Sequence, residues 1–218
     1  MREHVMRRHI DGSIWLARQN ALQEKELDKE MERVPGSLRW FPKNTGTPFS
    51  FFKNKYLKSA IIIGKGPSLD KLSRDMVKNK FLFFINDAVK KAKELDLKNI
   101  HVVQQDGNLQ DTCIPPSGIH FLSYYARGWN PKATLYKPEE LGIGANAPTV
   151  IAAIKICLFM GFTEFDLFAF DALKTNKITE YANIIGYSSV AKRPNAERFF
   201  IQDKMVKDTL KGFNWRYT

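Results

Sequence analysis

The chain has 218 residues, which suits one α/β domain with a full hydrophobic core and is too short for two ordinary ones. Apolar residues make up 44% and charged residues 26%, the composition of a folded globular protein, and no apolar run is long enough to cross a membrane. The formal charge of +11 favours an anionic ligand such as a nucleotide, a nucleic acid or an acidic glycan, although a lysine-rich solvated surface has the same composition.

The chain has only two cysteines, Cys113 and Cys157, and its four histidines lack the spacing of a metal site. The basic N-terminus is not followed by the apolar run and small-residue cleavage site of a secretory signal. We therefore expect a cytoplasmic protein in a reducing compartment, with neither a disulfide framework nor a metal centre.

In chain order, the first predicted element is a helix over residues 14–34, which ends at a Pro-Gly pair and carries only a thin apolar stripe. Residues 35–56 mix aromatic side chains with turn residues, which indicates an irregular connection held on the domain by its rings. Nucleic-acid stacking by these rings is a minor alternative. The expected organisation is an N-terminal helix with its connecting segment over residues 1–56, and a nucleotide-binding α/β domain over residues 57–218.

Short apolar runs, polar loops and helix-like segments alternate through that domain. The apolar runs predict buried strands over residues 60–63, 81–85, 100–104, 119–122 and 165–170. Helices are predicted directly after Ser68 and over residues 88–95, 148–160 and 196–210. This order is typical of a single-domain α/β fold with a doubly wound, mostly parallel, Rossmann-like sheet.

In open parallel sheets, ligands bind beyond the carboxyl ends of the strands. The first predicted strand is followed by Gly64-Lys65-Gly66-Pro67-Ser68. Its glycines lack Cβ atoms, so backbone N–H groups can approach a phosphate, and Ser68 would cap a helix with Leu69, Leu72 and Met76 on one face. The loop matches neither the Walker A nor the G-x-G-x-x-G pattern. A turn with a purely structural role is the alternative.

Polar residues also follow the second and third predicted strands. Asn86 and Asp87 would contact a base or a ribose, or else cap the next helix. Asp106, Asn108 and Asp111 would hold a sugar hydroxyl or a metal, or else form an ordinary turn.

Asp171 follows an apolar strand that does not itself require a carboxylate, which favours a role in the site. His101 and His120 alternate with apolar strand residues. That alternation favours places in the core or on a surface face over roles in a site.

Two blocks of the sequence resemble a superfamily of nucleotide-dependent transferases. Residues 61–69 are similar to its G-x-G-P-S-L nucleotide loop, and residues 144–171 are similar to its small-residue turn, alanine-rich helix and strand ending in an aspartate. Its branches are the bacterial sialyltransferases that use CMP-activated sialic acid, the motility-associated flagellin glycosyltransferases and the 6-hydroxymethylpterin diphosphokinase-like proteins. The resemblance covers about residues 60–175, roughly half of the chain.

The resemblance implies that the loop at residues 64–68 holds the nucleotide phosphates, that Asn86 contacts the nucleotide or donor sugar, and that residues 146–149 line the base pocket. Asp171 would close the site. Where the sialyltransferase branch has a histidine in an I-G-H-S-like segment, this chain has Tyr187. A tyrosine can donate a proton or bind a phosphate, but with a pKa near ~10 it is a poor base.

We therefore expect a nucleotide-sugar-dependent glycosyltransferase with a CMP-linked nonulosonic acid as donor and an acidic or glycan acceptor. A 6-hydroxymethylpterin diphosphokinase using ATP and magnesium is the alternative within the superfamily, with Asp106 and Asp111 as carboxylates for the metal. A non-catalytic nucleotide- or nucleic-acid-binding module is the second alternative, because the family histidine is replaced.

The expected site can be stated residue by residue. The expected catalytic residues are Asp171, Tyr187 and Asp106. The expected nucleotide-binding residues are Gly64, Lys65, Gly66, Pro67, Ser68, Asn86, Asp87, Asn108, Asn146 and Thr149. No cofactor is expected beyond the nucleotide donor, magnesium is expected only for the diphosphokinase, and nucleic acid is not expected as the natural partner.

Overall fold

The computed structural model describes residues 46–56, 58–105, 113–124, 130, 132–145, 147–175, 181–186 and 196–218. All of them belong to one compact unit, Lys43–Thr218. The helix predicted over residues 14–34 lies outside the described residues, and so do the site predictions for Asp106, Asn108, Asp111, Asn146 and Tyr187. The proposed domain boundary between residues 56 and 57 stays a prediction.

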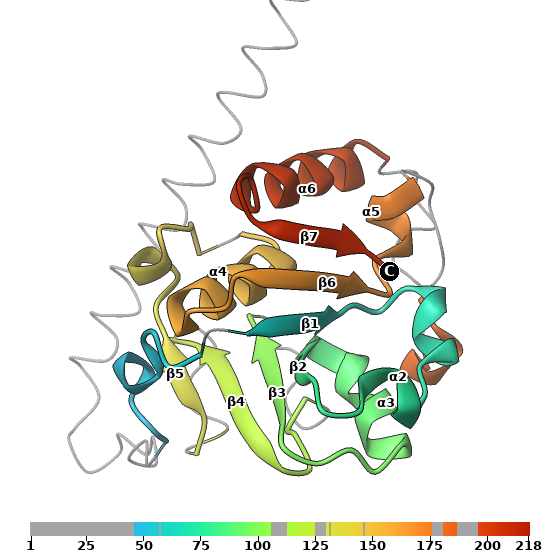
Figure 1. Cartoon of the computed structure of the whole chain (residues 1–218), viewed down its shortest axis with the longest axis horizontal. Coiled ribbons are helices and arrows are strands. Elements are labelled where there is room, and N and C mark those ends of the chain that lie inside the picture. The colour runs from blue at the N-terminus through green and yellow to red at the C-terminus, as the bar shows by residue number, and fades with distance from the viewer. Residues whose placement is uncertain are drawn as a thin grey trace, which may run out of the picture. The chain divides into compact units, whose positions relative to one another are not determined.

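Seven strands of the described chain form one all-parallel sheet, which confirms the predicted α/β class. They are β1 (Ser59–Ile63), β2 (Phe81–Ile85), β3 (Ile100–Gln104), β4 (Gly118–Ser123), β5 (Thr134–Tyr136), β6 (Glu164–Phe168) and β7 (Asn214–Tyr217). Their order is β5-β4-β3-β2-β1-β6-β7, and Figure 1 shows β1 and β6 side by side with β7 beyond them. The chain therefore winds outward from β1 to β5 and reverses direction between β1 and β6.

Helices pack on both faces of the sheet. The α-helices are α2 (Arg74–Val77), α3 (Val89–Glu94), α4 (Thr149–Met160), α5 (Asp171–Thr175) and α6 (Ala196–Thr209). The 3₁₀ helices are η2 (Phe49–Phe52), η3 (Pro67–Lys71), η4 (Asn86–Ala88), η6 (Pro138–Leu141) and η7 (Asn183–Ile185). One hydrophobic core lies between the sheet and η2, α4 and α6, and the other lies between the sheet and η3, α2, α3 and η7 (Figure 1). Among the described residues, no helix has the length and apolar character needed to cross a membrane.

The central strands β1 and β2 are rich in isoleucine and phenylalanine because both of their faces are covered by helices. The helix α4 is apolar on nearly all sides for a similar reason: it is packed against β1, β2, β3, α6 and η6. It ends at Gly161, whose φ is +97°, and a Cβ atom there would lie 2.4 Å from the carbonyl oxygen of Tyr56. Phe49 of η2 stacks on Phe159 with 4.4 Å between ring centroids, which packs the segment before β1 onto the domain.

The structure corrects three of the predicted elements. The helix expected after Ser68 is the five-residue turn η3, in which Ser68 is an internal residue and Gly66 holds the N-cap position. Met76 does not share a buried face with Leu69 and Leu72, since it is 49% exposed. Strand β6 ends at Phe168, two residues earlier than predicted, because Ala169 has a φ of +59° and leaves the extended conformation.

Candidate functional site

The reversal of strand order brings together two loops that are distant in sequence. Strands β1 and β6 are neighbours in register, with Ile63 opposite Phe168, so the loop at residues 64–68 meets the turn at residues 169–171. The N–H of Gly64 donates to the carbonyl oxygen of Phe168 at 2.8 Å. The N–H of Gly66 donates to the carbonyl oxygen of Ala169, also at 2.8 Å. Open α/β sheets bind their ligands at such a reversal, so we call these two loops the reversal site.

The two glycines of the loop are explained by close packing inside the protein. A Cβ atom on Gly64 would lie 2.4 Å from the carbonyl oxygen of Ala169. A Cβ atom on Gly66 would lie 2.1 Å from Oδ2 of Asp171. Both positions therefore require glycine whether or not a phosphate binds, and the structural alternative raised by the sequence accounts for them.

Ser68 and Asp171 form a direct pair across the reversal. The backbone N–H of Ser68 donates to Oδ2 of Asp171 at 3.1 Å, and its hydroxyl donates to Oδ1 in a second, short contact. The predicted role of Ser68 as a helix cap is wrong, because its hydroxyl reaches Asp171 and makes no cap hydrogen bond. The carboxylate lies where an anion would meet the N–H of Ser68, so the loop holds an internal negative charge.

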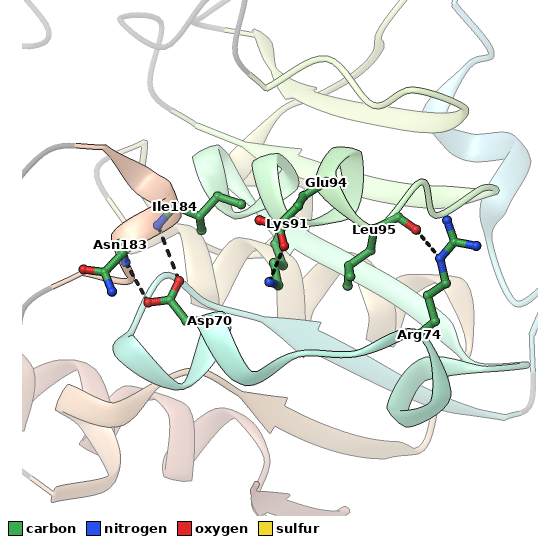
Figure 2. Close-up of polar contacts among 7 residues, drawn as sticks. All are labelled: Asp70, Arg74, Lys91, Glu94, Leu95, Asn183 and Ile184. Atoms are coloured by element: carbon green, nitrogen blue, oxygen red, sulfur yellow. Dashed lines mark hydrogen bonds and ion pairs between the residues drawn. The ribbon is translucent and has the colours of Figure 1, made fainter.

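The loop is also fixed from its other side, by η7. Asp70 accepts the N–H of Asn183 at 2.8 Å and the N–H of Ile184 at 3.4 Å (Figure 2). The N–H of Ala182 donates to the carbonyl oxygen of Lys65 at 2.9 Å. The segment at residues 181–186 therefore holds the loop against the domain, and this leaves little freedom for the positions of Ser68 and Asp171.

Figure 2 also shows one contact that joins α2 to the end of α3 and one ion pair within α3. The guanidinium Nε of Arg74 donates to the carbonyl oxygen of Leu95 at 2.5 Å. The buried ammonium group of Lys91 pairs with Glu94 at 2.6 Å, which neutralises a charge that is 8% exposed.

A cavity of about 160 Å³ adjoins the Ser68–Asp171 pair. It is lined by apolar residues of β6, by Met76 of α2 and by two lysines, Lys71 and Lys174. Neither lysine has an ion-pair partner among the residues that the structure describes. The size of the cavity and its two amines suit a phosphate or a carboxylate with a small attached group.

A second set of predicted residues meets at the start of α4. The side-chain amide of Asn86 lies 3.4 Å from the hydroxyl oxygen of Thr149, the first residue of α4. Asn86 is 4% exposed and has a φ of +48°. The first turn of α4 contains no acidic residue, and its N-terminus carries the positive end of a twelve-residue helix dipole. Asp87 is separate from this pair, since it is buried and accepts a contact from the thiol of Cys113 at 3.4 Å.

The sequence analysis missed several polar groups at the carboxyl edge of the sheet. Gln105 directly follows β3 and donates to the carbonyl oxygen of Ala145 at 3.0 Å. Ser123 ends β4, is 1% exposed, and its hydroxyl has no hydrogen-bond partner within the described ranges. Their positions at strand ends are the same signal that pointed to Asn86. Lys71 and Lys174 gave no such signal, because lysines on helices are common on any basic surface.

The two histidines of the sheet are core residues, as the alternation predicted. His120 is 4% exposed and lies between Gln104, at 3.0 Å from Nε2, and Asn130, at 2.8 Å from Nδ1. Burial lowers the pKa of His120 to about 4. Burial likewise lowers the pKa of His101 to about 4, so both rings are neutral at physiological pH.

Within the described residues, no group of three or more histidine, cysteine or carboxylate side chains could hold a metal ion. No protein-family model matches this chain, and no curated protein matches it. Fold and geometry together define its class: an α/β protein with an all-parallel sheet, whose strand order reverses beside a lysine-lined cavity.

Proposed function

We propose that this chain binds a nucleotide sugar at the reversal site and transfers its sugar to an acceptor, as a glycosyltransferase. The observation that carries the proposal is the Ser68–Asp171 pair beside the cavity with Lys71 and Lys174. These elements lie where parallel α/β sheets bind nucleotides. The resemblance to the G-x-G-P-S-L superfamily rests on the same loop and the same aspartate.

The charges around the site support this choice of donor class. A CMP-linked nonulosonic acid carries one phosphate and one carboxylate, and two regions of positive potential could receive them. One is the cavity with Lys71 and Lys174, and the other is the N-terminus of α4 beside Asn86 and Thr149. Such preorganised donors would stabilise the leaving phosphate, where negative charge develops in the transition state.

In this proposal Asp171 removes the proton of the acceptor hydroxyl, and Ser68 holds its carboxylate in place. Losing a general base lowers turnover by about 100-fold or more. Tyr187 and Asp106 remain proposed to bind phosphate and to assist the acceptor. We also propose a cytoplasmic location, which is supported by the two buried cysteines with free thiols.

One observation favours a second candidate, a nucleotide-binding module without catalysis. Both carboxylate oxygens of Asp171 already accept a hydrogen bond from Ser68, so the carboxylate has a complete structural role. The N–H groups of Gly64 and Gly66 are also used within the protein. Such a module would bind the nucleotide through Lys71, Lys174 and the start of α4 alone.

The test starts with calorimetric titration of CMP, UDP, GDP and ATP, with and without magnesium, followed by assays of CMP release from a CMP-linked nonulosonic acid. We expect CMP to bind without magnesium and its release to depend on a glycan acceptor. The double variant Lys71→Gln/Lys174→Gln should bind CMP at least about tenfold more weakly. The control Lys204→Gln/Lys211→Gln removes the same charge at exposed positions that do not line the cavity, and it should bind normally.

Three results would contradict this proposal. Binding of none of the four nucleotides would remove the nucleotide site. ATP turnover that strictly requires magnesium would favour the diphosphokinase. CMP binding without release of CMP from any donor would favour the non-catalytic module.

A further inference from the structure

The turn after β6 contains a residue in an unusual backbone conformation. Ala169 has a φ of +59°, in the left-handed region that residues other than glycine and asparagine rarely adopt. The other described non-glycine residues with a positive φ are asparagines and one aspartate. Ala169 is only 2% exposed, so this is not a loose turn on the surface. Such conformations persist where the surrounding structure holds them, and they concentrate at functional sites.

The contacts around Ala169 hold it in this conformation. Its carbonyl oxygen accepts the N–H of Gly66 at 2.8 Å, and a Cβ atom on Gly64 would lie 2.4 Å from the same oxygen. The carbonyl oxygen of Phe168 accepts the N–H of Gly64 at 2.8 Å. The loop at residues 64–68 therefore holds the peptide groups on both sides of Ala169.

The left-handed residue changes which face of the sheet the following side chains meet. In an extended strand, successive side chains point to opposite faces. Leu167 lies in the core on the face covered by η2, α4 and α6, the α4 face, and Phe168 lies in the core on the opposite, η3 face. Ala169 lies on the η3 face as well, and Phe170 returns to the α4 face. The alternation is therefore shifted by one residue from Ala169 onward.

This shift decides where the side chain of Asp171 points. Unbroken alternation from Phe168 would turn it toward the apolar core of the α4 face. With the shift, Asp171 meets Ser68 of η3 and accepts both its N–H, at 3.1 Å, and its hydroxyl. We propose that Ala169 is a positioning residue of the reversal site, whose left-handed conformation directs the Asp171 carboxylate toward the loop after β1. Its role in turnover rests on the glycosyltransferase function proposed above, whereas its effect on the Ser68–Asp171 pair is measurable without substrate.

The test compares substitutions at position 169 that accept or oppose a positive φ. Glycine accepts it freely, whereas valine, which is β-branched, opposes it strongly. The measured quantity is the coupling between Ser68 and Asp171, obtained by urea denaturation of a double-mutant cycle in each background. We expect a coupling of about fivefold in the unfolding equilibrium constant in the wild type and in Ala169→Gly, and of less than about twofold in Ala169→Val.

Ala92→Val is the matched control for added volume. Ala92 is a fully buried alanine of the same core, but it lies in α3, where the helical backbone accepts valine. Both valine variants should lower the overall stability, and only Ala169→Val should remove the coupling. If Ala169→Val does not fold, Ala169→Asn and Ala169→Thr give the same comparison with side chains of similar size. Asparagine tolerates the left-handed conformation and should retain the coupling, and threonine should lose it.

Turnover gives the second readout. Ala169→Gly should release CMP within about threefold of the wild-type rate, and Ala169→Val at least about 100-fold more slowly, as for loss of a general base, while CMP still binds within about tenfold. Full coupling or unchanged turnover in Ala169→Val overturns the proposal, and so does an equal loss of coupling in Ala92→Val. Absence of CMP binding and turnover in the wild type contradicts only the glycosyltransferase function, because the coupling is measured without substrate.

Discussion

Ser68 donates both its backbone N–H and its hydroxyl to the carboxylate of Asp171, a residue 103 positions further along the chain. This pair joins the loop after β1 to the turn after β6 at the reversal of strand order. The stability of the reversal site and any chemistry at it therefore depend on the same two residues, and variants at these positions must be assayed for both.

A double-mutant cycle measures the Ser68–Asp171 pair directly. We expect Ser68→Ala to lower the free energy of unfolding by about 1 kcal/mol, and Asp171→Ala to lower it by about 2–3 kcal/mol because it leaves two donors without an acceptor. The double variant should cost about 1 kcal/mol less than the sum of the single variants. Urea denaturation of the four proteins gives these values, and strict additivity would show that the pair contributes nothing.

Asp171→Asn separates the catalytic role of Asp171 from its structural one. The glycosyltransferase proposal predicts a loss of turnover of at least about 100-fold, while CMP binds within about tenfold of the wild type. Thermal melting and CMP release are measured on the same preparation. A destabilised protein with full turnover would leave Asp171 with a structural role only.

The glycine at position 66 should contribute strongly to the stability of the protein. In Gly66→Ala the new Cβ would lie 2.1 Å from Oδ2 of Asp171 and 2.8 Å from the carbonyl oxygen of Ala169, so we expect a loss of about 3 kcal/mol or more in unfolding free energy. Gly144→Ala is the matched control, because its Cβ would meet no atom within 4 Å, and it should stay within about 0.5 kcal/mol of the wild type. Chemical denaturation of both variants measures the two free energies of unfolding. Similar values would show that the loop can shift enough to accommodate a Cβ atom at position 66.

The free energy of unfolding should decrease as the pH is lowered, because of the two buried histidines. Burial lowers the pKa of His101 and of His120 from 6.5 to about 4, so the unfolded state binds more protons than the folded state in this interval. The contribution is complete above about pH 6.5 and is lost as the pH falls towards about 4, by an amount on the order of 3 kcal/mol for each histidine.

The variant His101→Phe checks this assignment. It retains the ring packing against Phe83 and Phe121 and removes one of the two titrating groups. The loss of stability between about pH 7 and about pH 4.5 should therefore be roughly halved, as measured by urea denaturation across that range. An unchanged pH profile would mean that His101 is not the neutral, buried group described above.

The edge strand β7 should depend on one buried polar contact. The hydroxyl of Tyr217 donates to Oδ1 of Asp203 at 2.8 Å, and Asp203 is 4% exposed. Burial, together with the Asp203 carboxylate, raises the pKa of Tyr217. We expect Tyr217→Phe to lower the free energy of unfolding by about 1–3 kcal/mol, because the buried carboxylate loses a donor.

The neighbouring position on β7 offers a matched control. Arg216 pairs with Asp166 at 2.6 Å, but its side chain is 72% exposed. An exposed ion pair contributes little, so Arg216→Gln should change the urea midpoint far less than Tyr217→Phe does. Equal effects would indicate that β7 is held by its exposed face.

Much of the fold was predictable from the sequence. The strands β1, β2 and β3 are short, mostly apolar runs next to polar residues. The apolar run of α4 is too long for a strand, so composition and length alone identified these elements. The edge strands β5 and β7 were missed, because a strand with one neighbour and a partly exposed face has no such continuous run. The early end of β6 was missed because the positive φ of Ala169 is set by the packing of the turn.

The sequence by itself determined which residues follow the carboxyl ends of β1, β2 and β3, since local apolar patterning decides where these central strands stop. It could not decide which of those residues meet, because that depends on the order of strands in the sheet. Only the tertiary structure placed Ser68 against Asp171 and Asn86 against Thr149. It also showed that Gly64 and Gly66 are required by the backbone of the β6 turn, a long-range contact that no local pattern contains.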